Sequence, residues 1–288
     1  MTFIENAHDV LEVFNYFAPK NGGVAVRRFL TGVVGVPIIL ACLYFGGFFL
    51  VALVAVCSAM MIAELRRMFD LRILNLNFYV ALFVVAFLIV GRFLFTPTQQ
   101  LYVLVIVILV LLIVGVFCRK DTRIVDLAVD YISVFYIALM FSFLIDIRLA
   151  EDGLAAVVIL FLIVWIYDTG AYFFGIRFGK HKMFPVLSPK KSWEGFGCGL
   201  ATVLVVVLLV NLLMGYFRPW QEMVLLILIT AITAQVGDLI ESFLKRQAGV
   251  KDSGNFLPGH GGFLDRFDSF LCAAPIYFLT LQFLLWVM

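Results

Sequence analysis

Long apolar blocks, each parted from the next by a short polar break, run through most of this chain. A block of about 20 residues is the length at which an α-helix crosses the roughly 30 Å hydrocarbon core of a bilayer. We therefore predict an all-α polytopic membrane protein with about nine transmembrane helices. The predicted spans are residues 29–46, 48–65, 77–95, 101–118, 128–147, 154–175, 196–216, 222–241 and 268–287.

Two features near the N-terminus leave alternatives open. Only Gly46 and Gly47 separate the first two spans, so these spans form either a tight helical hairpin or one re-entrant unit. Residues 1–20 intersperse acidic side chains with Ile, Val, Leu and Phe, which is typical of an amphipathic helix at the membrane interface but also fits an unstructured tail.

The composition supports a lipid environment. Hydrophobic residues make up 64% of the chain and charged residues 14%, against about 45–50% and about 25% in soluble domains. No basic run with interleaved aromatic residues is present, so we expect no nucleic-acid partner. The five cysteines are widely spaced without a CxxC pair, and we interpret them as buried hydrophobic residues.

Basic residues are divided unevenly between the two sides that nine spans define. Of the 21 Lys and Arg residues, 18 lie on one side, and only Arg92, Arg148 and Arg218 lie on the other. Because Lys and Arg accumulate on the cytoplasmic side of membranes, we predict that the N-terminus and the polar loops 176–195 and 243–267 face the cytosol. Met288 would then face the opposite side.

The chemistry is concentrated toward the C-terminus. We interpret the chain as a single integral membrane domain, residues 1–288, with a cytosolic N-terminal segment at 1–28, a transmembrane scaffold at 29–150 and a catalytic half at 151–288.

The richest polar segment is SFLKRQAGVKDSGNFLPGHGGFLDRFD, from Ser242 to Asp268. Aspartates suit Mg²⁺, which prefers oxygen ligands, and Lys and Arg suit phosphate oxygens. Asp265 and Asp268 are three residues apart and would share one face of a helix that begins near Gly261 and Gly262. The alternative is a helix cap followed by a favourable acidic first turn.

A polar stripe precedes this segment. Gln235, Asp238, Ser242 and Lys245 fall at i, i+3, i+7 and i+10, on one face of a helix. Carboxylates at membrane depth are costly and usually functional, although Asp238 could pair with Lys245 or Arg246 purely for structure. Glu241 lies off this stripe and carries less weight.

Two upstream motifs carry further candidates. Asp168 lies in IYDTGAYFFG inside an apolar block, where Gly170 and Gly175 fit a small-residue packing face that does not explain the carboxylate. The sequence SPKKSWEG, from Ser188 to Gly195, places Lys190 and Lys191 at the entrance to a span; this pair is either a cation site or an ordinary cytoplasmic basic flank.

These motifs resemble those of phosphatidate cytidylyltransferases, also called CDP-diacylglycerol synthases. The resemblance rests on S-x-L-K-R, K-D-S-G-N, P-G-H-G-G and D-R-F-D within 27 consecutive positions, and on SPKKSWEG and DTGAYFFG upstream. The form GVKDSGN is closer to the bacterial members. The resemblance covers the C-terminal half closely, whereas the N-terminal half agrees only in being membrane-spanning.

The resemblance implies that CTP and phosphatidate give CDP-diacylglycerol and pyrophosphate, with Mg²⁺ and a second cation that could be K⁺. It also implies an enzyme of the bacterial cytoplasmic (inner) membrane, which draws phosphatidate from the cytosolic leaflet. Asp238 and Asp265 become the leading metal ligands, with Asp268 and Asp168 as further candidates. We expect catalytic roles for Asp238, Asp265, Asp268 and Lys251. Expected substrate contacts are Ser188, Lys190, Lys191, Ser242, Lys245, Arg246, Asp252, Asn255, His260, Gly261, Gly262 and Arg266.

Other readings remain open at this point. Another CTP-using membrane enzyme, such as a polyprenol kinase or a synthase with a different lipid acceptor, would share the phosphate chemistry. An ion-coupled transporter would also carry intramembrane carboxylates, but its charges would mark a path across the membrane rather than cluster at one face. The sequence leaves open whether the chain is a monomer or a homodimer.

Overall fold

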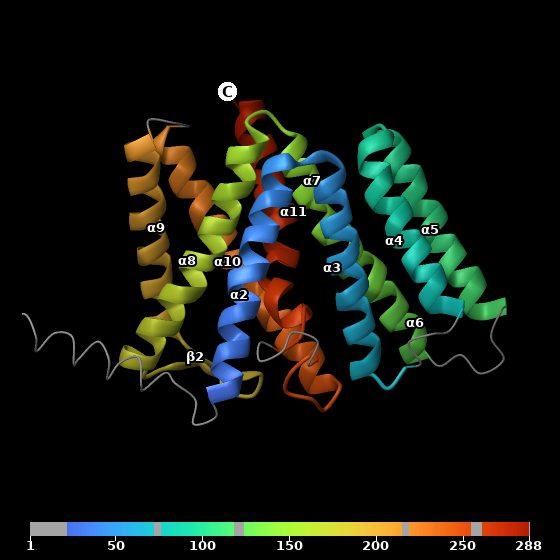
Figure 1. Cartoon of the computed structure of the whole chain (residues 1–288), viewed down its shortest axis with the longest axis horizontal. Coiled ribbons are helices and arrows are strands. Elements are labelled where there is room, and N and C mark those ends of the chain that lie inside the picture. The colour runs from blue at the N-terminus through green and yellow to red at the C-terminus, as the bar shows by residue number, and fades with distance from the viewer. Residues whose placement is uncertain (1–21, 72–75, 118–123, 215–218, 255–260, 288) are drawn as a thin grey trace, which may run out of the picture.

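The computed structural model shows a bundle of helices (Figure 1). It describes residues 22–71, 76–117, 124–214, 219–254 and 261–287. Within these residues, the strands are β1 (Lys182–Phe184) and β2 (Ser188–Ser192), which pair antiparallel. The helices are α2 (Gly22–Phe45), α3 (Gly47–Met68), α4 (Leu76–Leu94), α5 (Pro97–Phe117), α6 (Ile124–Tyr131), the π-helical η1 (Ile132–Leu139), α7 (Met140–Leu149), α8 (Gly153–Phe178), α9 (Trp193–Met214), α10 (Trp220–Gln247) and α11 (Leu264–Val287).

The predicted fold class is confirmed. Seven stretches of described helix are long and apolar enough to cross a membrane, and α6, η1 and α7 together form one of them, Ile124–Leu149. Shorter apolar stretches, Gly32–Phe45 and Leu82–Leu94, coincide with the first and third predicted spans. The amphipathic helix considered for residues 1–20 lies outside the described residues.

The first two spans form the helical hairpin. Gly46 takes a φ of 62° between α2 and α3, a left-handed conformation that glycine adopts without steric cost. Arg148 of α7 donates from Nε to the Leu43 carbonyl oxygen at 2.9 Å and from Nη2 to the Tyr44 carbonyl oxygen at 3.1 Å. These carbonyls end α2 and lack partners within the helix, so the arginine stabilises the turn.

Two helices continue beyond their apolar parts. α10 runs to Gln247, six residues beyond the end of the predicted span at residue 241. α11 begins at Leu264, four residues before the predicted start at residue 268. Backbone hydrogen bonding within a helix does not require apolar side chains, so polar residues extend both helices at the same end of the bundle. Lys245 and Asp265 are therefore held on helices rather than on a loop.

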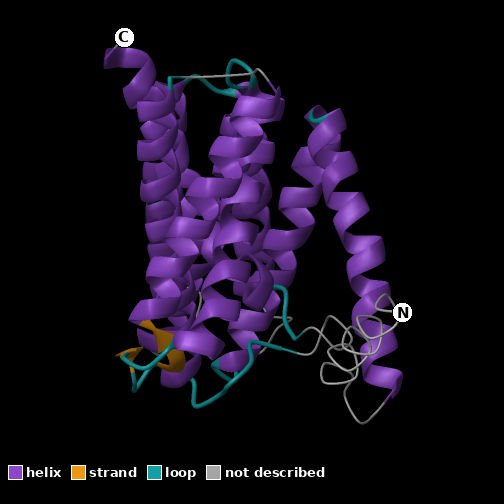
Figure 2. Cartoon of the chain, turned by 90° about the vertical axis from the view of Figure 1, so that its left-hand side faces the viewer, coloured by secondary structure: helices purple, strands orange, loops and turns teal. Residues whose placement is uncertain are grey.

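The polar segments gather at one end of the bundle. Figure 1 shows the β-hairpin, the end of α10 and the start of α11 at the lower end, with the C-terminal end of α11 at the upper end, and Figure 2 shows the same separation. Arg246 donates to the carbonyl oxygens of Leu187 at 3.4 Å and Val250 at 3.0 Å, which ties the two predicted loops together.

Candidate functional site

Three carboxylates converge near the end of the bundle that carries the polar segments. Asp238 and Glu241 belong to α10 and Asp268 to α11, and one oxygen from each lies within 4.8 Å of the others. Glu241 has 0% of its surface exposed and Asp268 has 8%. We call these three residues the carboxylate cluster.

Close packing of α10 against α11 brings the cluster together. A Cβ atom at Gly237 would lie 2.4 Å from the carbonyl oxygen of Asp268, so only glycine allows this approach. The adjacent Asp238 then faces Asp268 across the contact. The Tyr136 hydroxyl, from η1, donates to the Gly237 carbonyl oxygen at 3.3 Å and adds a third segment to the same place.

Asp168 of α8 adds a fourth carboxylate beside the cluster. It interacts electrostatically with Asp238 and Lys191, and a hydrogen bond joins it to the Ser269 side chain. Unlike Glu241 and Asp268, it is exposed at the molecular surface. Its helix packs closely on α9, since a Cβ at Gly170 would lie 3.0 Å from Thr202, as the small-residue pattern predicts.

Two lysines neutralise part of this negative charge. Lys191 Nζ of β2 lies 2.6 Å from Asp238 Oδ2. Lys245 Nζ lies 2.5 Å from Glu241 Oε2 and 2.8 Å from Asp265 Oδ1. Both side chains are largely buried, at 17% and 12% exposed. Within the described residues, carboxylates therefore outnumber lysines at this site, and buried like charges this close need a further cation or a proton.

The donor set fits a hard cation. All the candidate ligand atoms of the cluster are carboxylate oxygens. Mg²⁺ and Ca²⁺ prefer oxygen ligands, whereas softer metals favour nitrogen or sulfur. Asp238, Glu241 and Asp268 are placed to hold such an ion, with Asp168 nearby.

Asp265 is not one of the three clustered carboxylates, although it interacts with Glu241, which is one of them. Its Oδ1 accepts from Lys245, and its Oδ2 accepts from the Ser253 N–H at 3.1 Å, the Ser253 hydroxyl at 2.9 Å and the Gly262 N–H at 2.9 Å. These donors surround both oxygens. Of the four aspartates predicted as metal ligands, the structure brings Asp168, Asp238 and Asp268 together and places Asp265 in the adjoining loop contacts.

The remaining predicted residues lie around these groups. Ser242 donates to Asp238 Oδ1 at 3.4 Å, and Ser188 on β2 is half-buried. Asn255 and His260 lie outside the described residues. Gly261 and Gly262 border Asp265, with Gly261 at a φ of 83°. Exposed at or beside the polar segments are Lys190, Arg246, Lys251, Asp252 and Arg266.

Sequence reasoning undervalued Glu241 and did not single out Glu64 or Tyr136. The signal for Glu241 was present, because it stands three residues after Asp238 and four before Lys245, and both spacings bring side chains together on a helix. Glu64 of α3 accepts hydrogen bonds from the N–H groups of Phe263 and Leu264. No local pattern indicates such a contact across 199 and 200 residues of sequence.

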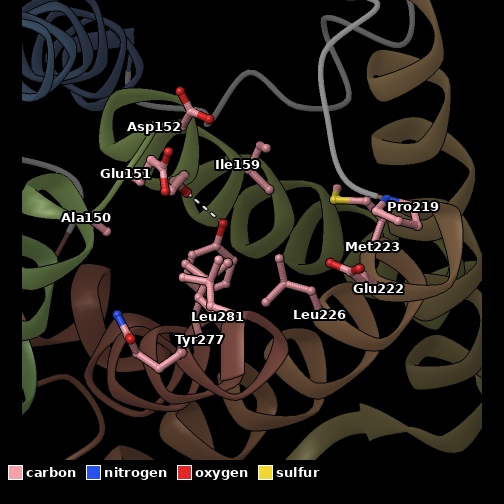
Figure 3. Close-up of a pocket in the computed structure, with 13 residues that line it drawn as sticks. Ala150, Glu151, Asp152, Ile159, Pro219, Glu222, Met223, Leu226, Tyr277 and Leu281 are labelled. Carbon is pink, nitrogen blue, oxygen red and sulfur yellow. Dashed lines mark hydrogen bonds between the residues drawn. The ribbon is translucent and has the colours of Figure 1, made fainter. Parts of the chain in front are cut away.

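A cavity of about 260 Å³ lies at the opposite end of the bundle, beside the start of α10 and the C-terminal part of α11 (Figure 3). Tyr277 stands within it and donates to the Ala156 carbonyl oxygen at 2.8 Å. Among the residues that the structure describes, its lining includes Glu151, Asp152 and Glu222 but no lysine, arginine or histidine. Unlike the carboxylate cluster, which Lys191 and Lys245 contact, this cavity has no described basic side chain that could bind phosphate, so we do not place the site there.

Comparisons with known proteins identify the family of the chain. Residues 26–284 match the sequence profile of the cytidylyltransferase family. A phosphatidate cytidylyltransferase of Bacillus subtilis (strain 168) is 34% identical over 263 residues, which are 89% of this chain and 98% of that protein. One from Staphylococcus haemolyticus (strain JCSC1435) is 35% identical over 251 residues, 86% and 96% of the two chains. One from Staphylococcus aureus (strain COL) is 43% identical over 181 residues, 62% and 67% of the two chains.

Proposed function

The chain belongs to the cytidylyltransferase family of enzymes, and from this premise we propose that it transfers CMP from CTP to phosphatidate. A phosphate oxygen of the lipid attacks the α-phosphorus of CTP, and a new P–O–P bond forms. The bond between the α-phosphorus and the bridging oxygen breaks, and pyrophosphate leaves. The products are CDP-diacylglycerol and pyrophosphate.

The observation that carries this proposal is the convergence of three carboxylates and a lysine from three elements. Asp238 and Glu241 on α10, Asp268 on α11 and Lys191 on β2 meet where the polar segments gather. Such a mixture of fixed positive charge and oxygen donors suits a metal-bound polyphosphate, whose negative charge must be neutralised before another phosphate can approach.

We propose that Asp238, Glu241 and Asp268 hold Mg²⁺, with Asp168 as a candidate ligand for a second cation, Mg²⁺ or K⁺. A bound divalent cation would neutralise charge on phosphate oxygens without any proton transfer. Asp265 as a direct ligand stays a prediction, since Lys245, Ser253 and Gly262 already donate to its oxygens.

The lysines have complementary roles in this proposal. Lys191 lies 2.6 Å from Asp238, close enough to the cluster to contact a phosphate bound there. Lys245 is held between Glu241 and Asp265, which fixes its ammonium group before substrate arrives and lowers the cost of orienting it. Exposed Lys190 and Arg246 extend the positive charge toward water.

No side chain is required as a strong general base. The second pKa of a phosphate monoester is about 6, so the lipid phosphate already carries a nucleophilic, anionic oxygen near neutral pH. The catalytic problem is bringing two anions together in line, and fixed cations and positioning address it.

We further propose that this end of the bundle faces the cytosol of a bacterial cytoplasmic membrane. The 18 basic residues that the spans place on one side support this orientation. CTP would arrive from water, and phosphatidate from the adjacent leaflet. Asp168 is exposed and the Asp238 side chain is 33% exposed, which leaves the cluster accessible from the surface.

Purified protein supplied with phosphatidate and CTP labelled on the α-phosphate tests the proposal. We expect the label in a lipid product, with one pyrophosphate released for each lipid formed. CTP labelled on the γ-phosphate should leave the lipid unlabelled. Lipid labelled by the γ-phosphate would instead indicate a kinase, and no lipid product from either substrate would refute a CTP-dependent lipid enzyme.

A further inference from the structure

Glu64 is a buried carboxylate that the proposed reaction does not use. It lies one turn from the end of α3, in the half of the chain predicted to be scaffold, and is only 2% exposed. A glutamate this deeply buried normally requires polar partners.

Its partners belong to the start of α11. Glu64 Oε1 accepts from the Phe263 N–H at 2.9 Å, and Oε2 accepts from the Leu264 N–H at 2.9 Å. The first N–H groups of a helix have no partner within that helix and carry partial positive charge. Glu64 therefore caps α11 from a helix about 200 residues earlier in the chain.

The same carboxylate also contacts the segment before α11. Ser253 donates its hydroxyl toward Glu64 Oε2 at 3.3 Å and toward Asp265 Oδ2 at 2.9 Å. A Cβ atom at Gly254 would lie 3.0 Å from Glu64 Oε1, and one at Gly262 would lie 2.5 Å from Glu64 Oε2. The two glycines leave the space that the carboxylate occupies.

A continuous set of contacts links Glu64 to the carboxylate cluster. Ser253 connects it to Asp265, Asp265 accepts from Lys245, and Lys245 lies against Glu241. The start of α11 also sets the position of Asp268, which stands one helical turn further along.

We propose that Glu64 is a positioning residue for the active site: it fixes the start of α11 and the Ser253–Gly254 backbone, so that Asp265, Lys245 and Asp268 hold their places. The expected effect of Glu64 on turnover rests on the proposed function. Its expected effect on the position of α11 does not. Glu64 does not touch the carboxylate cluster directly, and its effect is transmitted through α11.

The test compares Glu64→Ala and Glu64→Gln with Ser58→Ala as the matched control. Ser58 is equally buried on α3, and its Oγ has no hydrogen-bond partner among the described residues. For Glu64→Ala we expect kcat to fall on the order of 10- to 100-fold, as misplacement of catalytic groups by about 1 Å does. Glu64→Gln, which keeps one acceptor oxygen, should recover part of the loss, and Ser58→Ala should keep kcat within about twofold of wild type.

Hydrogen exchange separates positioning from general stabilisation. In Glu64→Ala we expect faster exchange in peptides covering residues 250–270, with α8 and the apolar part of α10 protected as in wild type. Unchanged kcat and unchanged exchange would overturn the proposal. Equal loss of protection throughout the bundle would overturn it too, because Glu64 would then stabilise the whole fold. If the wild-type protein made no CDP-diacylglycerol, the proposed function would fail while the exchange experiment still tested the role of Glu64.

Discussion

The aspartate and glutamate side chains at this site have very different surroundings. Asp238, Glu241 and Asp268 point oxygens at one another within 4.8 Å, whereas Asp265 is enclosed by hydrogen-bond donors. The first arrangement is unfavourable without added positive charge, and the second is favourable as it stands. The two kinds of aspartate should therefore respond differently to substitution and to metal concentration.

Replacing a member of the carboxylate cluster should remove activity through the metal. For Asp238→Asn and Glu241→Gln we expect turnover to fall by about 100-fold or more, since even residues that only support metal ligands cost roughly 10–100-fold. Steady-state rates measured across a Mg²⁺ titration check this, and residual activity should need more Mg²⁺. Glu151→Gln, a change at the opposite end of the bundle, is the control and should behave as wild type. A normal rate with an unchanged Mg²⁺ requirement in Glu241→Gln would exclude Glu241 from the metal site.

Chelation provides an independent check of the same site. Treatment with EDTA should abolish turnover, and added Mg²⁺ should restore it, because the cluster offers only the oxygen ligands that this ion prefers. Full activity in the chelator would contradict a divalent metal requirement.

Lys191 should matter more than its neighbour Lys190. Lys191 is paired with Asp238 and is 17% exposed, whereas Lys190 is exposed. We expect Lys191→Ala to lower kcat/KM for CTP by about 10-fold or more, and Lys190→Ala by a few-fold at most, because an exposed charge interacts weakly through water. Initial rates at varied CTP distinguish them. Equal, small effects would show that neither lysine contacts substrate and that the pair only marks the cytosolic side of the span.

At the scale of elements, close helix contacts depend on a few small or polar groups. Gly237 lets α10 approach the Asp268 carbonyl, and Arg148 caps the end of α2. Arg92 pairs with Asp146 at 2.9 Å and donates to Ser142. Arg92 and Arg148, which the charge pattern placed on the side with few basic residues, thus have structural partners near that end.

Separating α10 from α11 should disable the site without changing any ionisable group. A side chain at Gly237 would meet the α11 backbone at 2.4 Å, so Gly237→Leu must displace Asp268 from Asp238. We expect turnover to fall about 100-fold, on the scale at which small misplacements matter, while the protein remains in the membrane. Gly197→Leu is the matched control, since nothing lies within 4 Å of a Cβ there. Comparable activity in the two variants would show that the α10–α11 distance is not critical.

At the scale of the whole molecule, both polar segments lie at one end and α11 finishes at the other (Figures 1 and 2). Two segments distant in sequence can contribute to one site only if they emerge on the same side, and the bonds from Arg246 to Leu187 and Val250 show that they do.

Accessibility of single cysteines should report this arrangement in a cysteine-free background. We expect Val186→Cys, 87% exposed in the β-hairpin, and Asp252→Cys to react only with reagents that reach the cytosol. Glu151→Cys should react from outside, because it lies between α7 and α8 at the other end. Labelling of Val186→Cys and Glu151→Cys from the same side would contradict the nine-span topology.

By itself the sequence determined the all-α membrane fold, the approximate positions of the spans and the segments in which the candidate site residues lie. These properties follow from local information: apolar length reports a span, and the spacing of Gln235, Asp238, Ser242 and Lys245 reports a helix face. Only the tertiary structure decided that Glu241 rather than Asp265 joins Asp238 and Asp268, and that Glu64 caps α11. Such contacts depend on the rotation and separation of packed helices, because a shift of a few ångströms decides which side chains meet, and hydrophobic periodicity does not encode that shift.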